Sequence, residues 1–172
     1  MVKLSCMAHE HEFFMQEAMA EADVALSLNE VPVGAVVVLN NEIIGRGHNQ
    51  TITLCDPSLH AEVVAVRDAA KHIKNYRLLD ATLYVTLEPC CMCAGLLVHS
   101  RIKTLVFGAY DYKAGAVGSI MNVAQNDKLN HKIDVIGGVL ETQCSENLSA
   151  FFKERRALKK AMKAKRDLAN GL

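Results

Sequence analysis

The chain contains no tryptophan, and aromatic residues make up only 5% of its 172 positions. Its core must therefore be built mainly from valine, leucine, isoleucine and alanine. No apolar run reaches the roughly 18 residues that suggest a membrane-spanning helix. The sequence also lacks internal repeats, low-complexity tracts and linkers rich in Gly, Pro or Ser. We therefore expect one domain over residues 1–172, with residues 1–8 flexible.

The N-terminal segment has no apolar core of the kind found in secretory signals, because it turns acidic at Glu10 and Glu12. This predicts a cytoplasmic location. In that compartment the six cysteines are better interpreted as metal ligands or buried thiols than as a disulfide framework. Three of them, Cys90, Cys91 and Cys93, are also too close together for three separate bridges.

The formal net charge is zero, but the charges are unevenly distributed. Residues 151–172 contain eight basic and two acidic residues, a charge of +6, so the rest of the chain carries −6. Such asymmetry is typical of a protein with a polyanionic partner. An ordinary solvated helix end, with cations in its last turns, accounts for the same charges equally well.

Apolar periodicity and turn residues predict an alternation of helices and strands. Two strands around Asn40 and Asn41 form a hairpin, so part of the sheet is antiparallel. Helices are expected at 9–29, 60–74, 89–100 and 144–167, and strands at 33–39, 42–47, 82–87, 103–108 and 132–139. This order favours an α/β layered fold with a mixed sheet. Proline at position 89 suits the first turn of the third helix.

Three residues with metal-ligand spacing stand at the starts of the two middle helices. His60 begins one helix, and the Cys-x-x-Cys step of Cys90 and Cys93 begins the next. Ligands at the carboxyl ends of strands, where helices start, converge in such folds. Closed structural zinc sites use four protein ligands, whereas catalytic sites use three and leave a position for water. The spacing therefore predicts a catalytic zinc ion.

Glu62 lies two residues after His60, so the two side chains point to different sides of a regular helix. This disfavours Glu62 as a ligand and favours it as the group that moves protons to and from the attacking water. The matching reaction is hydrolytic loss of ammonia from an amino-substituted ring. The combined His-x-Glu and Pro-Cys-x-x-Cys pattern is the signature of zinc-dependent nucleobase deaminases.

Two other interpretations of the cysteines remain. A lone Cys-x-x-Cys step can be redox-active, although that chemistry does not call for His60 and Glu62. A closed structural site completed by Cys55, Cys91 or Cys144 is the second alternative. Otherwise Cys91 is expected to pack on another face of its helix, and Cys6, Cys55 and Cys144 to be ordinary thiols.

Longer segments of the chain resemble the bacterial tRNA-specific adenosine deaminases, a family within the cytidine deaminase superfamily. The likeness extends over about residues 9–160. It is carried by the metal motifs and by residues 31–37, 75–88, 99–102, 111–119 and 151–156. The resemblance implies a three-layer α/β/α sandwich around a mixed five-stranded sheet. It also implies a homodimer with one zinc ion per subunit, which converts adenosine to inosine at the first anticodon position of a tRNA.

The resemblance also implies substrate-binding roles. Asn49 corresponds to an asparagine that binds the flipped base, and Asp111 to an acidic residue near the neighbouring ribose. Phe152 and Arg156 correspond to residues that meet the anticodon loop, with Arg155 beside them. Without the resemblance, ordinary roles would be favoured: a loop-capping Asn, a turn Asp, a buried Phe and solvated arginines.

Four positions depart from the family pattern and bear on which tRNAs are accepted: His48, Thr51, Leu59 and Tyr110. A deaminase of free nucleobases such as guanine or cytosine would share the zinc ligands but would have no use for the basic tail. A zinc-stabilised RNA-binding module without activity is the other alternative, and it would not depend on Glu62.

Overall fold

The computed structural model describes the backbone of residues 2–169 and the side chains of residues 9–167. The flexibility expected of residues 1–8 stays a prediction, because residue 1 and the side chains of residues 2–8 lie outside this described part. Among the described residues, no helix combines the length and the apolar character that a membrane crossing requires.

Five strands form one mixed sheet in the order β2-β1-β3-β4-β5. The hairpin of β1 (Gly34–Leu39) and β2 (Glu42–His48) is antiparallel, and β1 is also antiparallel to β3 (Thr82–Leu87). The strands β4 (Thr104–Ala109) and β5 (Asp134–Gly137) continue the sheet in parallel with β3. The predicted mixed α/β sheet is confirmed.

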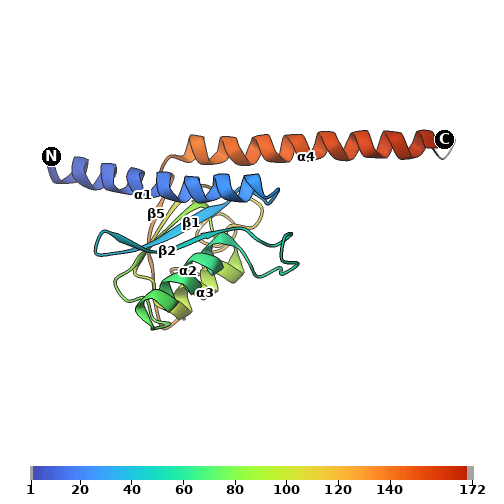
Figure 1. Cartoon of the computed structure of the whole chain (residues 1–172). Helices are drawn as coiled ribbons and strands as arrows, with labels where there is room; N and C mark the ends of the chain where they lie inside the picture. Colours follow the sequence, from blue (N-terminus) through green and yellow to red (C-terminus); the bar gives the residue numbers. More distant parts are fainter. Residues whose placement is uncertain (1, 170–172) are drawn as a thin grey trace.

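Helices cover both faces of the sheet (Figure 1). The helices α2 (Ala61–Ile73) and α3 (Cys91–Ser100) pack on one face, and α1 (Val2–Ser27) and α4 (Glu141–Ala169) lie on the other. This is the three-layer arrangement that the resemblance implied. Alternate residues of each strand point to opposite faces of the sheet. Val37 and Leu83 are buried on the α2–α3 side, whereas Val36 and Tyr84 are buried on the α1–α4 side.

Two glycines bring the helix α2 close to the sheet. A Cβ atom on Gly47 would lie 2.4 Å from both the Ala61 carbonyl oxygen and the Ala65 nitrogen. A Cβ atom on Gly45 would lie 2.4 Å from the Ala65 carbonyl oxygen. Only glycine permits this backbone approach. Because Ala61 opens α2, these glycines also fix where the first turn of that helix lies.

Several predicted boundaries were wrong by a few residues. The helix α1 begins at Val2 rather than near residue 9, because neither Gly nor Pro interrupts that stretch, and it ends at Ser27. Asn29, with a φ of 59°, turns the chain before Val31 and Pro32. The helix α3 begins at Cys91 rather than at Pro89. The Pro89 carbonyl instead accepts a hydrogen bond from the Ala116 N–H.

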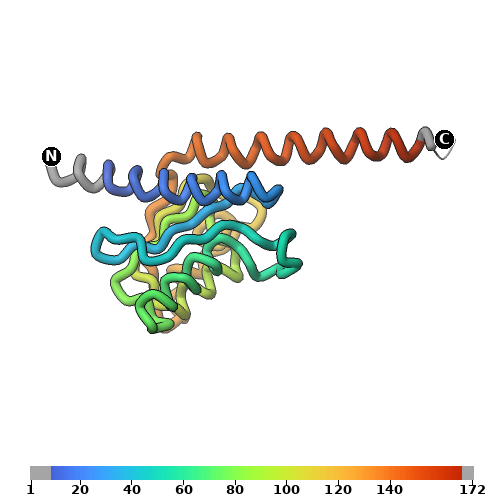
Figure 2. Tube along the Cα trace, in the orientation of Figure 1, coloured from blue at the N-terminus to red at the C-terminus, as the bar shows by residue number. Residues whose placement is uncertain are grey.

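The C-terminal helix α4 packs on the rest of the domain over only part of its length. The helix α4 continues well past the C-terminal end of α1 and projects from the sheet (Figure 2). Its first half is anchored by the buried side chains of Cys144, Leu148 and Phe151. Every residue from Phe152 to Arg166 is exposed.

Candidate metal centre and substrate pocket

Three potential metal ligands, His60, Cys90 and Cys93, lie together, with their ligand atoms within 4.8 Å of one another. The Nδ1 atom of His60 is 3.7 Å from the Cys90 Sγ and 3.6 Å from the Cys93 Sγ. A tetrahedral zinc ion bonded at about 2.3 Å to sulfur and 2.0–2.1 Å to nitrogen holds such atoms about 3.6 Å apart. The donor set and its spacing therefore fit zinc.

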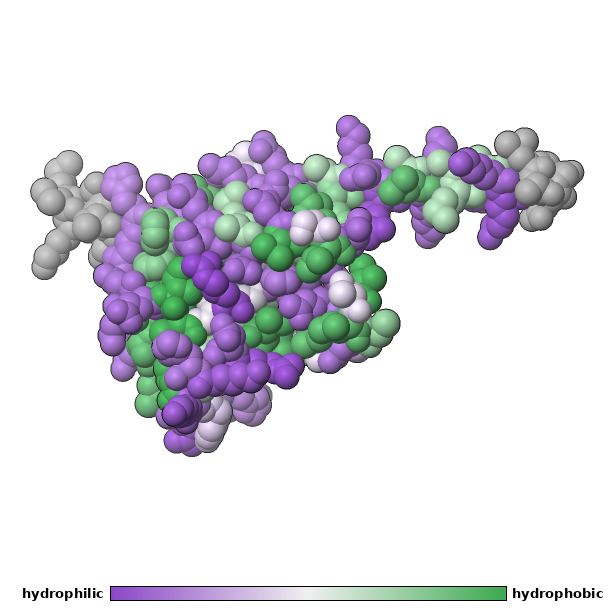
Figure 3. Space-filling view, viewed as in Figure 1, coloured by the Kyte–Doolittle hydropathy of each residue, from purple (hydrophilic) through white to green (hydrophobic). Residues whose placement is uncertain are grey.

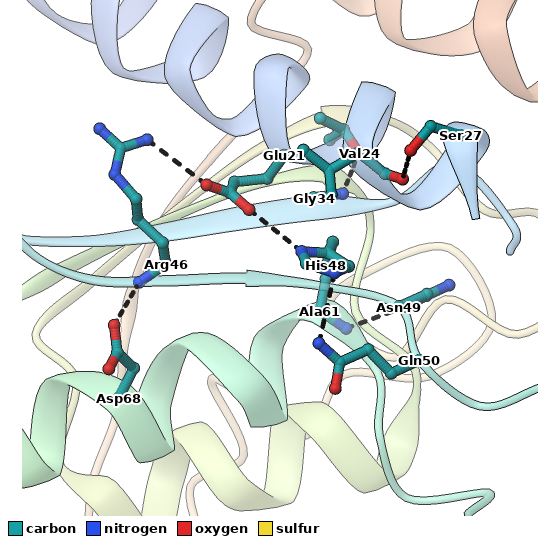
Figure 4. Close-up of polar contacts among 11 residues, drawn as sticks. Glu21, Val24, Ser27, Gly34, Arg46, His48, Asn49, Gln50, Ala61 and Asp68 are labelled. Carbon is teal, nitrogen blue, oxygen red and sulfur yellow. Dashed lines mark hydrogen bonds and ion pairs between the residues drawn. The ribbon is translucent and has the colours of Figure 1, made fainter. Parts of the chain in front are cut away.

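The ligands are positioned by the starts of two helices. His60 is the N-cap residue of α2, and Cys90 is the N-cap residue of α3. Within the described part of the chain, neither side chain caps its own helix through a hydrogen bond, so both are available to a metal. Asn49 takes over this task for α2, because its Oδ1 accepts the Ala61 N–H at 2.9 Å (Figure 4). The partial positive charge of a helix N-terminus favours thiolates.

The pKa values of the Cys90 and Cys93 thiols are shifted in opposite directions. A hydrogen bond from Cys93 and one from His60 lower the pKa of Cys90 to about 3. The same bond and burial raise the pKa of Cys93. Two adjacent thiolates repel each other, so a dication between them is what lets both ionise. The pair is therefore suited to a divalent metal.

Glu62 lies in the first turn of α2 and is only 4% exposed. Burial raises the pKa of its carboxyl group above the usual value. Among the described residues it is not part of the ligand cluster. A carboxyl group with a raised pKa can both take and return a proton, which is the requirement for a general acid–base group.

A cavity of about 210 Å³ adjoins the ligands. Its lining includes Asn49, Thr51, His60, Glu62, Cys90 and Asp111. A larger hollow of about 720 Å³ lies over α1, β2 and α2. The lining of that hollow is a mixture of acids and bases, such as Asp68 and Lys71, and contains no cysteine. The smaller cavity is thus where metal chemistry and a bound ring can meet.

The two predicted substrate-binding residues of the cavity wall also make internal hydrogen bonds. Asn49 donates from Nδ2 to the Val31 carbonyl at 3.2 Å, in addition to accepting the Ala61 N–H. Its amide still has one hydrogen and one lone pair to offer to a base. The Oδ1 of Asp111 accepts the backbone N–H groups of Lys113 and Ala114 at 2.9 and 3.2 Å. Both residues therefore shape the wall as well as line it.

Glu88, a buried carboxylate in the wall of the cavity, is a site residue that the sequence pattern did not predict. It accepts the backbone N–H groups of Asp111, Val117 and Ser119, each at 3.1 Å, and also the Ser119 hydroxyl. Burial opposes its ionisation, but these hydrogen bonds outweigh burial and lower the pKa of Glu88. A charged residue at the end of an apolar strand was the available signal. Glu88 holds the segment 111–119 against the site.

Replacing Glu88 with glutamine should lower the free energy of unfolding by about 1–3 kcal/mol, because an amide nitrogen would then face N–H donors in a buried position. Chemical denaturation measures this change. Glu146→Gln on the exposed surface of α4 removes the same charge and should stay within about 0.5 kcal/mol of the parent. Equal effects of the two substitutions would show that Glu88 does not hold the loop.

The residues that depart from the family pattern have structural partners. The His48 Nδ1 lies 3.1 Å from the Glu21 Oε2 (Figure 4). Leu59 is buried, and Tyr110 packs edge-on against Phe107. These three side chains are therefore part of the local packing.

The predicted RNA-contacting residues of the basic tail differ from one another in their contacts with the rest of the protein. Phe152 is 44% exposed beside the buried Phe151, and Arg156 is exposed. Arg155 instead donates from Nη2 to the Asn29 carbonyl at 2.6 Å, and its guanidinium lies over the Phe151 ring.

The remaining cysteines that the structure describes stand apart from the ligands. Cys55 and Cys91 are exposed, and Cys144 is buried against α4's side of the sheet. Among the described residues the ligand group has three members, so a closed site completed by one of these cysteines finds no support there. The side chain of Cys6 lies outside the described part.

Known proteins that are similar to this chain are deaminases. The sequence profile of the MafB19-like deaminases matches residues 9–156. A tRNA-specific adenosine deaminase of Haemophilus influenzae is 54% identical over 89% of both chains. The tRNA-specific adenosine deaminase of Bacillus subtilis is 49% identical over 88% of this chain and 94% of its own length.

Solved structures are similar as well. A structure from a study of A-to-I editing by tRNA:A34 deaminases has a TM-score of 0.76 and 42% identity, over 79% of this chain and 99% of the other. A guanine deaminase of Bacillus subtilis has a TM-score of 0.57 and 33% identity, over 85% of this chain and 94% of the other.

Proposed function

The chain belongs to the family of tRNA-specific adenosine deaminases, and we propose that it hydrolyses adenosine to inosine at the wobble position of a tRNA with one zinc ion per subunit. The observation that carries this proposal is the placement of Glu62, His60 and Cys90 in the wall of one small cavity, with the buried Cys93 beside these two ligands. A cavity of about 210 Å³ suits a single flipped base rather than a folded nucleic acid.

His60, Cys90 and Cys93 would hold the zinc ion. When bound, zinc lowers the pKa of a coordinated water from about 9 for the aqueous ion toward 7, which supplies hydroxide at neutral pH. Glu62 takes the proton of the attacking water and delivers protons to the ring nitrogen and then to the leaving amino group. The oxygen of water bonds to C6 of adenine, the C6–N bond breaks, and ammonia leaves.

The substrate is held by the walls of the cavity and by the tail. Asn49 would hydrogen-bond the flipped base through its spare hydrogen and lone pair, and Asp111 would approach the neighbouring ribose. Phe152 offers an exposed ring for stacking, and Arg156 a charge for phosphate. An unpaired loop nucleotide leaves its stack at low cost, which favours an anticodon loop as substrate.

We further propose that the chain is a single deaminase domain that acts as a homodimer in the cytoplasm. Exposed apolar side chains in the loop after β4 support dimerisation, because a second copy could bury them: Tyr112, Ile120 and Met121. A tRNA substrate supports the cytoplasmic location.

A synthetic anticodon stem-loop with adenosine at the wobble position tests the function. Mass spectrometry of the digested product should show inosine at that position and unchanged adenosine elsewhere. Free adenosine, guanine and cytosine at the same concentration should remain unchanged. Activity confined to the free compounds would overturn the proposal and favour a nucleobase deaminase, the alternative that the similarity to a guanine deaminase supports.

A further inference from the structure

The turn that joins α1 to β1, residues 29–31, receives hydrogen bonds from two distant segments of the chain. Arg155 of α4 donates to the Asn29 carbonyl at 2.6 Å. Asn49, from the segment after β2, donates to the Val31 carbonyl at 3.2 Å. The turn therefore lies between the basic helix and the substrate cavity.

Between these two contacts, Glu30 is fully buried and holds a third segment. One oxygen of its carboxylate accepts the N–H groups of Ile52 and Thr53 at 2.8 and 2.6 Å, and the other accepts the Thr51 hydroxyl at 3.2 Å. Burial opposes ionisation, but these hydrogen bonds outweigh it and lower the pKa of Glu30. Hydrogen bonds to an ionised carboxylate are about twice as strong as neutral ones. Because Thr51 lines the cavity, Glu30 fixes part of the cavity's rim.

The turn is connected to the metal centre through Asn49. The Asn49 side chain donates to the Val31 carbonyl. It also accepts the N–H of Ala61, the residue that follows the ligand His60 (Figure 4). A movement of residues 29–31 would therefore act on two parts of the cavity. One is the rim at residues 51–53, and the other is the start of α2.

Arg155 lies where α4 leaves the body of the protein. Its guanidinium is 5.1 Å from the centre of the buried Phe151 ring, and all residues from Phe152 to Arg166 are exposed. On the projecting part of α4, hydrophilic residues are interspersed with apolar ones (Figure 3). RNA bound to this projecting part would stabilise the hydrogen bond between Arg155 and the Asn29 carbonyl.

We propose that Arg155 and Glu30 are positioning residues that couple RNA binding on α4 to the shape of the cavity rim. Arg155 acts on the reaction through the turn 29–31, whereas Arg156 and Phe152 act on RNA directly. This inference rests on the proposed function for its substrate. Coupling of this kind is reciprocal: an ordered rim favours RNA on α4 as much as RNA on α4 favours an ordered rim.

The first test uses the protein without RNA. Hydrogen exchange at the amides of Ile52 and Thr53 should become about 5-fold faster or more in Arg155→Gln. Lys159→Gln, which removes the same charge one helical turn further along the exposed part of α4, should leave this exchange unchanged. Equal exchange in Arg155→Gln and the parent would overturn the coupling.

The second test uses the anticodon stem-loop. Arg155→Gln should raise KM by about 5-fold or more, with kcat within about 2-fold, because Glu62 and the ligands are untouched. The slope of log KM against log salt concentration should not change. A lost phosphate contact would reduce that slope by about 0.7, and this result would assign Arg155 to RNA binding instead.

A double-mutant cycle completes the test. Glu30→Gln should raise KM as Arg155→Gln does, and the double variant should show less than the product of the two effects. Thr51→Val removes one donor to Glu30 at a partly exposed position and replaces Glu30→Gln in the cycle if the buried substitution unfolds the protein. Effects that simply multiply would overturn the inference. Failure of the parent protein to deaminate the stem-loop would instead contradict the proposed function, and the exchange experiment would still decide the coupling.

Discussion

Replacing Glu62 with glutamine should lower kcat by about 10²–10⁴-fold while zinc remains bound. The substitution keeps the shape of the side chain and removes the group that takes and returns protons. Glu62 is buried in the first turn of α2 and is not part of the ligand cluster among the described residues, so its loss should not release metal.

Single-turnover assays on the stem-loop, together with zinc analysis of the same preparation, measure both parts of this expectation. Glu42→Gln on the exposed β1–β2 hairpin removes the same charge and should keep full activity. Turnover by Glu62→Gln within about 10-fold of the parent would remove Glu62 from the mechanism. A parent protein without turnover, whose RNA binding is unchanged in Glu62→Gln, would favour the RNA-binding module without catalysis.

Replacing Cys90 or Cys93 with serine should release the metal and destabilise the fold. Binding energies of about 10–16 kcal/mol for four-ligand zinc sites correspond to roughly 3 kcal/mol per ligand, so zinc affinity should fall by about 100-fold or more. The melting temperature should fall with it, because a bound ion would join the starts of α2 and α3.

Cys91→Ser provides the matched control for this experiment. Cys91 lies between the two ligands in sequence but is exposed, so zinc affinity should stay within about 2-fold of the parent. Competition with a chromogenic chelator gives the affinities of all three variants. Equal zinc retention by Cys91→Ser and Cys93→Ser would show that the sulfur of Cys93 is not a ligand.

Features that depend on near neighbours in the sequence could be predicted well. The strand Thr82–Leu87 was predicted to the residue, because a β-rich apolar run ends at turn residues on both sides. Cys90 and Cys93 were placed together because three residues span less than one helical turn. Their approach to His60 required only that both segments start helices at strand ends.

Features that depend on distant partners could not be predicted. Glu88 binds amides 23 to 31 residues away, and Glu30 binds groups 21 to 23 residues away. Arg155 and Asn29 are 126 residues apart. Sequence pattern shows a charged residue near apolar neighbours, but only the folded chain shows which donors satisfy it. The same reason explains the error at Pro89, whose carbonyl is bound by Ala116 rather than by its own helix.

These distant contacts also suggest how the rim of the cavity is specified. One wall is held by Glu88 through the segment 111–119, and another by Glu30 through residues 51–53. Both carboxylates are buried, and each has a pKa below the usual value for glutamate. Thr51 and Tyr110, two of the departures from the family pattern, lie in or beside these loops. Differences in tRNA preference within the family should therefore be sought there.

The most direct measurement of the central claim is deamination of the stem-loop in water enriched in oxygen-18. The account predicts inosine that carries one heavy oxygen at C6 of the wobble base, with one ammonia released for each inosine formed, and loss of the reaction when a chelator removes the metal. Adenosine that remains unchanged in the zinc-loaded protein, or inosine formed without solvent oxygen, would contradict it.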